Sequence, residues 1–83
     1  TFNIVYKDLA HSLLSVSGYS KGALVEKASI SSFLVGDIIL KVGEQELNKS
    51  NSLNEILHQY KSGANVRFTL IRNGKEILID IIL

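Results

Sequence analysis

The segment that decides the fold runs from Val66 to Leu83 and has the sequence VRFTLIRNGKEILIDIIL. Its centre, Arg72-Asn73-Gly74-Lys75, is flanked by alternating apolar residues and predicts a two-residue type I′ β-hairpin. In the register that this turn imposes, three apolar pairs face each other on one side: Val66 with Ile81, Phe68 with Ile79 and Leu70 with Ile77. The same register places Arg67 opposite Asp80 on the other side, as an opposite-charge pair. A slip of one residue would lose both matches, so the pairing is strongly specified.

A second β-hairpin is expected upstream of this one. The run Asp37–Val42 (DIILKV) follows Gly36 and predicts a buried strand. Gly43 and Glu44 come next, and Gly at the first central position is typical of a type II′ turn. This turn would pair Leu40 with Leu47 and Val42 with Gln45.

The segment between the two hairpins predicts the main helix. Ser50 or Ser52 is the expected N-cap, and Glu55 completes a capping box with Ser52. The helix is expected to continue to about Lys61, and Gly63 ends it. Its apolar stripe has the spacing i, i+3, i+4, i+7 and consists of Leu53, Ile56, Leu57 and Tyr60.

The first third of the chain is less regular. We predict a strand over Phe2–Tyr6, a short helix from Asp8 to Gly18, and a strand over Gly22–Ala28. Ser29–Val35 is expected to be a loop with one helical turn. The predicted fold class is therefore α+β: a small, bent, mostly antiparallel sheet or partial barrel of five to six strands, capped by one long helix and a shorter helix.

Composition narrows the range of functions. Eighty-three residues form one domain, residues 1–83, and the absence of a leading Met suggests that the domain is excised from a larger protein. A net charge of +1 gives no electrostatic basis for binding nucleic acid, and the apolar runs are too short to insert into a membrane. Without Cys, and with only two distant His, the chain predicts no metal site and no cofactor. No catalytic motif is present, so we expect a non-catalytic domain.

At Gly36–Val42 the sequence resembles the "GD-apolar-apolar" core strand of PDZ domains. Gly63–Lys75 is similar to the final hairpin of that family, and Ser52-Leu53 onwards is similar to its peptide-flanking helix. Thr1–Ile4 falls where bacterial members carry an aromatic-apolar-Gly-apolar loop. Because the chain begins with this strand and ends with the hairpin, it resembles the circularly permuted bacterial PDZ domain of high-temperature-requirement serine proteases and related envelope proteins.

The resemblance implies a peptide-binding groove between the first strand and the main helix. Peptide C-termini, or exposed apolar segments of proteins, would join the sheet as an added strand. The residues that the resemblance places in this groove are Phe2, Asn3, Ile4, Val5, Tyr6, Leu53, Leu57 and Tyr60. We expect Leu53 and Leu57 to keep exposed surface and Ile56 to face the core. The alternative is that the strand and the helical stripe serve only as core.

Two segments depart from the family pattern. Asn3 replaces the usual Gly, so its side chain would crowd the peptide carboxylate, and Ser29–Val35 is a shortened form of a segment that is normally helical.

The resemblance implies a regulatory or substrate-recruiting domain of a periplasmic bacterial protease, monomeric in isolation. The alternative is a structural assembly domain of a secretion or scaffold protein, whose groove is vestigial or contacts a neighbouring subunit.

Overall fold

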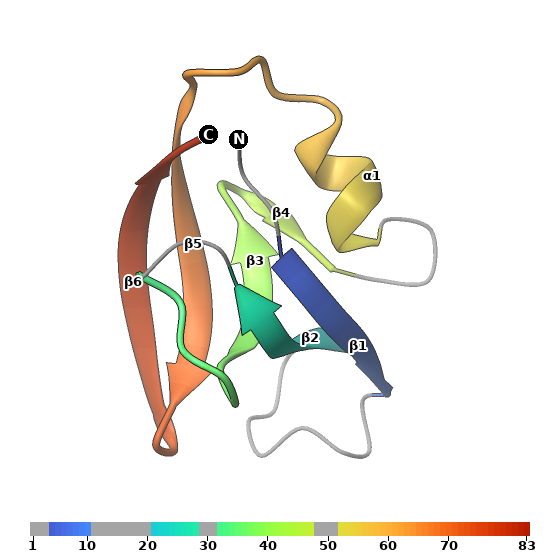
Figure 1. Cartoon of the computed structure of the whole chain (residues 1–83), viewed down its shortest axis with the longest axis vertical. Coiled ribbons are helices and arrows are strands. Elements are labelled where there is room, and N and C mark those ends of the chain that lie inside the picture. Colours follow the sequence, from blue (N-terminus) through green and yellow to red (C-terminus); the bar gives the residue numbers. More distant parts are fainter. Residues whose placement is uncertain (1–3, 11–20, 29–31, 48–51) are drawn as a thin grey trace.

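The computed structural model describes residues 4–10, 21–28, 32–47 and 52–83. These residues form one antiparallel sheet in the order β1-β2-β3-β5-β6, with the short β4 beside β3, and one short helix, α1 (Figure 1). The elements are β1 (Ile4–Ala10), β2 (Lys21–Ala28), β3 (Ile38–Val42), β4 (Gln45–Glu46), α1 (Leu53–Leu57), β5 (Asn65–Arg72) and β6 (Lys75–Ile82). The predicted α+β class and the number of strands are confirmed.

Both predicted hairpins have the expected registers. In β5–β6, Val66 pairs with Ile81, Phe68 with Ile79 and Leu70 with Ile77. Asn73 and Gly74 have φ values of 54° and 76°, as a type I′ turn requires. In β3–β4, Val42 pairs with Gln45, and the Leu47 N–H donates to the Leu40 carbonyl at 3.1 Å.

The core lies between β2, β3, β5–β6, α1 and the loop before β3. Its centre is Phe68, which is fully buried and meets Phe33 edge to face at a ring-centroid distance of 5.2 Å. The buried cluster consists of Ala23, Val25, Phe33, Ile39, Val42, Leu47, Leu53, Ile56, Val66, Phe68, Leu70 and Ile81. Each large apolar side chain buried here contributes about 1.5–3 kcal/mol, so this cluster is the main source of stability.

The sheet contains two irregularities in register. Between β1 and β2, Val5 pairs with Lys27 and Tyr6 with Val25, so Glu26 has no opposite residue. Between β3 and β5, the register shifts between Ile39 and Lys41, and Leu40 is the additional residue. Such β-bulges re-aim side chains and increase local twist. Glu26 is exposed, whereas Leu40 is fully buried.

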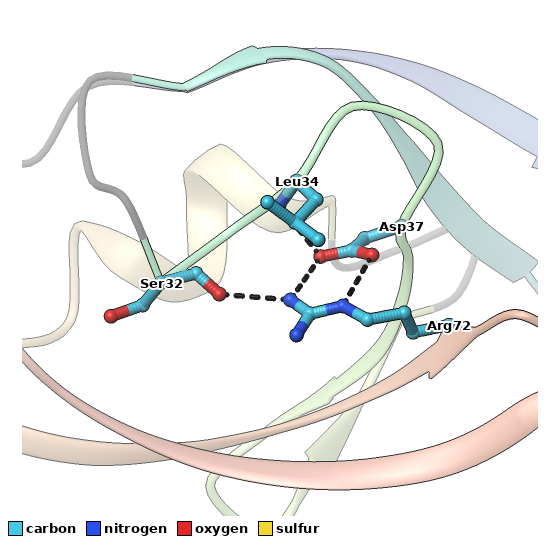
Figure 2. Close-up of polar contacts among 4 residues, drawn as sticks. All are labelled: Ser32, Leu34, Asp37 and Arg72. Atoms are coloured by element: carbon cyan, nitrogen blue, oxygen red, sulfur yellow. Dashed lines mark hydrogen bonds and ion pairs between the residues drawn. The ribbon is translucent and has the colours of Figure 1, made fainter.

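An ion pair between buried Asp37 and part-buried Arg72 connects the loop before β3 to the end of β5 (Figure 2). The Arg72 guanidinium donates to both carboxylate oxygens of Asp37, at 2.9 and 2.7 Å, and to the Ser32 carbonyl at 2.9 Å. The Leu34 N–H also donates to Asp37, at 2.9 Å. Hydrogen bonding to Asp37 raises the pKa of Arg72, although partial desolvation opposes this shift. The Asp of the GD motif therefore has a structural role: it attaches residues 32–37 to the final hairpin.

The prediction of a long helix is wrong. α1 begins as expected, because the Ser52 Oγ accepts a hydrogen bond from the Glu55 N–H at 3.3 Å, but it ends at Leu57 rather than near Lys61. After Leu57 the backbone forms tighter, 3₁₀-type turns, because the amides of Gln59 and Tyr60 donate to carbonyls three residues earlier. Contacts with the β3–β4 hairpin, described below, hold this tightened segment in place.

The shorter helix is also absent from the described residues. Asp8, its expected N-cap, lies within β1, because the first strand continues to Ala10 instead of ending at Tyr6. The remaining predicted helical residues lie outside the described part of the chain. The expected helical turn within Ser29–Val35 is not seen either, since residues 32–37 form turns and the preceding three lie outside the description.

Candidate functional site

The first component of the site is the free edge of β1. In the sheet order, β1 pairs with β2 and is the end strand, and no other described strand lies on its outer edge. The other end strand is β6, on the far side of the sheet (Figure 1). The unpaired backbone N–H and C=O groups of an end strand can accept another extended segment.

The second component is α1, which lies near the beginning of β1 (Figure 1). The two elements are joined by a hydrogen bond from the Asn54 backbone N–H to the Tyr6 hydroxyl, at 3.2 Å. Ile4 and Tyr6 are half-buried against the core, whereas Val5 and Lys7, which alternate with them, are exposed. Leu57 of α1 is also half-buried against the core. A strand edge therefore lies beside a helix, and apolar side chains of both elements are partly accessible.

The predicted helical residues differ in their positions. Leu53 is fully buried, so the expectation that it keeps exposed surface is wrong. It belongs to the same closed cluster as Ile56, whose predicted core position is confirmed. Leu57 is half-buried and packs against the core, so it keeps exposed surface as expected.

The end of the helical segment is held by the β3–β4 hairpin. The Gln45 Nε2 donates to the Gln59 Oε1 at 2.9 Å. The Tyr60 hydroxyl lies so close to Gly43 that an added Cβ there would be 2.7 Å away. Tyr60 is half-buried and packs against the core, but its hydroxyl points to the turn of this hairpin. The beginning of the helical segment therefore contacts Tyr6 of β1, whereas Tyr60, at its end, contacts the β3–β4 turn.

The predicted residues of the first strand are only partly described. Phe2 and Asn3 lie outside the described residues, so the expected crowding by Asn3 remains a prediction. Val5 is 54% exposed, and its side chain points away from the core, on the opposite face of β1 from Ile4 and Tyr6. Val5 therefore contributes to the β1 edge through its backbone. The backbone N–H of Asn54 was not predicted as part of the site. The sequence signal was Tyr6 itself, whose polar end needs a partner when its ring packs against a core.

Besides the β1 edge, the described residues could in principle present a metal site, a second pocket or a membrane-spanning helix. Within them, no group of three or more His, Asp or Glu side chains could hold a metal ion. The polar depression lined by Gly43, Glu44, Asn65, Arg67 and Asp80 lies along β5–β6, away from the β1 edge. No helix in this part of the chain is long and apolar enough to cross a membrane. At the β1 edge, the structure offers unpaired backbone groups beside partly accessible apolar side chains.

Comparisons with known proteins agree with this geometry. A probable periplasmic serine endoprotease DegP-like from Pseudomonas putida (strain W619) is 36% identical over 85 aligned residues, which cover 93% of this chain and 17% of that protein's length. No solved structure matches the chain at comparable stringency. The family model described as "PDZ domain" matches residues 14–83. The chain therefore belongs to the PDZ domain family, a family of peptide-binding modules, and is of the type found in DegP-like proteases.

Proposed function

We propose that this domain binds extended peptides as an added strand along the free edge of β1. The observation that carries the proposal is the position of this edge beside α1, with half-buried Ile4, Tyr6 and Leu57 next to it. Backbone hydrogen bonds to β1 would provide affinity, and the apolar side chains would provide specificity.

The site favours apolar peptides. The partly accessible side chains beside the edge are those of Ile4, Tyr6 and Leu57, which are aliphatic or aromatic. A charged peptide side chain docked here would lose water without gaining a partner. By resemblance, a free C-terminal carboxylate would lie near Asn3 at the beginning of β1. Peptide C-termini and exposed apolar segments of unfolded proteins are therefore the proposed ligands.

The relative in Pseudomonas putida supports a role in the cell envelope. Its name describes a probable periplasmic serine endoprotease, and this chain spans about a sixth of its length. We propose that the present domain also belongs to a periplasmic protease and that it recruits substrates or regulates the enzyme.

The binding mode can be tested by titrating isotope-labelled domain with an apolar peptide that has a free C-terminus. The molecule provides an internal control because it has two end strands. Amide shifts are expected to change along β1 and α1 and to remain constant along β6. Changes centred on β6 would contradict the proposal.

The peptide affinities of a matched pair of variants test the same binding mode. Leu57→Lys is expected to abolish binding, because the ammonium would lose water when the peptide docks. Leu78→Lys introduces the same charge at a 58% exposed position on β6 and is expected to bind normally. If both variants bind the peptide like the unmodified domain, α1 does not border the site.

A further inference from the structure

Tyr6 is held at both ends of its side chain. Its ring packs against the buried core, and its hydroxyl accepts the hydrogen bond from the Asn54 N–H at 3.2 Å. Asn54 is the second residue of α1, and its N–H has no acceptor within the helix because it belongs to the first turn. A side chain from β1 thus satisfies a backbone donor 48 positions away in the sequence.

The position of Tyr6 in the β1–β2 ladder shows which way its side chain points. The register shift between Val5 and Tyr6 places Tyr6 opposite Val25, which is buried. Tyr6 therefore lies on the core side of β1, while Val5 points away from it. Since α1 is joined to this side through the Tyr6 hydroxyl, the ring extends from the edge strand to the first turn of the helix.

The Tyr6 ring packs against the buried cluster of the core. Leu53, the first residue of α1, is fully buried, as is Ile56 one turn later. Both belong to the buried cluster against which Tyr6 packs, so the ring cannot move deeper without displacing core side chains, and close-packed interiors do not tolerate such overlap. Moving outward would break its hydrogen bond to Asn54 and its contact with the core.

We propose that Tyr6 determines specificity by restricting the groove beside the first turn of α1 to small peptide side chains. This inference rests on the proposed binding mode. In an added strand, every second side chain points to the α1 side, and the one nearest Tyr6 meets the ring and its hydroxyl. Gly or Ala fits without moving Tyr6, whereas Leu or a larger residue requires the ring to leave its place.

The test is a leucine scan of a peptide probe. The parent probe is fluorescein-Gly-Ser-Ala-Ala-Ala-Ala-Val with a free C-terminus, and each of its four alanines is replaced in turn by leucine. The unmodified domain is expected to bind one of the four leucine peptides about tenfold more weakly than the parent, the range in which a pocket discriminates by size. Tyr6→Ala is expected to remove the penalty at that position and to leave the other three ratios unchanged. No assumption about the peptide register is needed, because the scan finds the position.

Two further variants separate specificity from general damage. Ile79→Ala removes a half-buried core contact on β6, far from the groove, and is expected to lower stability while keeping the ranking of the peptides. Tyr6→Phe keeps the ring and loses the hydrogen bond, so it tests the role of the hydroxyl even if Tyr6→Ala does not fold. It is expected to reduce the leucine penalty to about threefold, because the ring can then rotate more freely, and to speed hydrogen exchange at the Asn54 amide.

The outcomes distinguish this inference from the proposed function. If the probes bind along β1 but the leucine penalty persists in Tyr6→Ala, or in Tyr6→Phe where only that variant folds, the inference is overturned and the binding mode stands. If the probes bind along β1 and none of the leucine peptides binds more weakly than the parent, the inference is likewise overturned and the binding mode stands. If no peptide of the set binds the unmodified domain, the proposed function fails and the inference fails with it.

Discussion

The β5–β6 hairpin and the β1–α1 region are stabilised in different ways. The hairpin pairs eight residues of β5 with eight residues of β6 in one continuous register, and its turn residues have the backbone conformation that the turn needs. β1 and α1 are distant in sequence and meet through the Tyr6–Asn54 hydrogen bond and apolar packing. The hairpin is thus specified by neighbours along the chain, whereas the candidate groove depends on a few tertiary contacts.

This difference suits the proposed function. A region that admits an added strand needs an unpaired edge and side chains that are only partly buried, and both are features of low local stability. The regular hairpin on the other side of the sheet, with its buried inner face, supports such a region. Substitutions in the two regions are therefore expected to have different consequences for folding and for binding.

The largest effect is expected from charges introduced into α1. Ile56→Lys should unfold the domain, because a fully buried ammonium costs several kcal/mol and a domain of this size has about 5–8 kcal/mol in total. Leu53→Lys should behave in the same way, since Leu53 is equally buried. Leu57→Lys should lower the free energy of unfolding by less than about 1.5 kcal/mol, because the long side chain can reach solvent. Denaturant unfolding of the three variants measures this; if Leu57→Lys also unfolds, the stripe is entirely core.

The next effect tests whether the hairpin region depends on a tertiary contact as well. Asp37→Ala removes a buried carboxylate and leaves the Arg72 guanidinium and the Leu34 N–H without it. The expected loss is about 1.5–3 kcal/mol in the free energy of unfolding, the range for hydrogen bonds to a charged group, because Arg72 keeps access to solvent and its bond to Ser32. Chemical denaturation gives the value. A neutral result would show that the hairpin and the loop 32–37 are stable without this connection.

A pair of glycine substitutions compares the two regions directly. Gly74 in the β5–β6 turn and Gly43 in the β3–β4 turn both have positive φ, 76° and 62°, so alanine is expected to cost about 1 kcal/mol at either position. Only at Gly43 would the new Cβ meet the Tyr60 hydroxyl. Gly43→Ala should therefore shift the amide resonances of α1, and Gly74→Ala should not. Equal spectra for α1 in both variants would show that Tyr60 does not anchor the helical segment.

The smallest effect is expected at the exposed charge pair of the hairpin. The Arg67 Nε donates to Asp80 at 2.9 Å, which raises the pKa of Arg67, but both side chains are more than half exposed. Asp80→Asn should leave the thermal midpoint nearly unchanged, because solvent screens such pairs. A clear loss would mean that this cross-strand pair, and not only the apolar face, maintains the register.

The sequence was sufficient to predict those parts of the fold that depend on local pattern. Alternation, an Asn-Gly turn and an opposite-charge pair predicted the β5–β6 register, and the Gly43 turn predicted the β3–β4 register. The length of α1 was not predictable from its stripe, because contacts of Gln59 and Tyr60 with the β3–β4 hairpin compete with continued helix. The extension of β1 to Ala10 depends on pairing with β2, which overrode the capping signal at Asp8.

The candidate site was predictable in outline through resemblance, and its details were not. Periodicity places Leu53 and Leu57 on one face of a helix, but it does not show that one is fully buried and the other only half-buried. That difference arises from where the short helix packs. The hydrogen bond between Tyr6 and Asn54 joins residues 48 positions apart in the sequence, and no local pattern indicates that Asn54 is the partner.

The two β-bulges imply different tolerance to insertions and deletions. Glu26 is exposed and has no opposite residue in β1, so its deletion would restore a regular ladder between β1 and β2. Leu40 is also an additional residue, but its side chain is fully buried, and deleting it would remove part of the interior. Among related sequences, changes in length are therefore expected in β2 near position 26 and not within β3, even though the same kind of irregularity occurs in both strands.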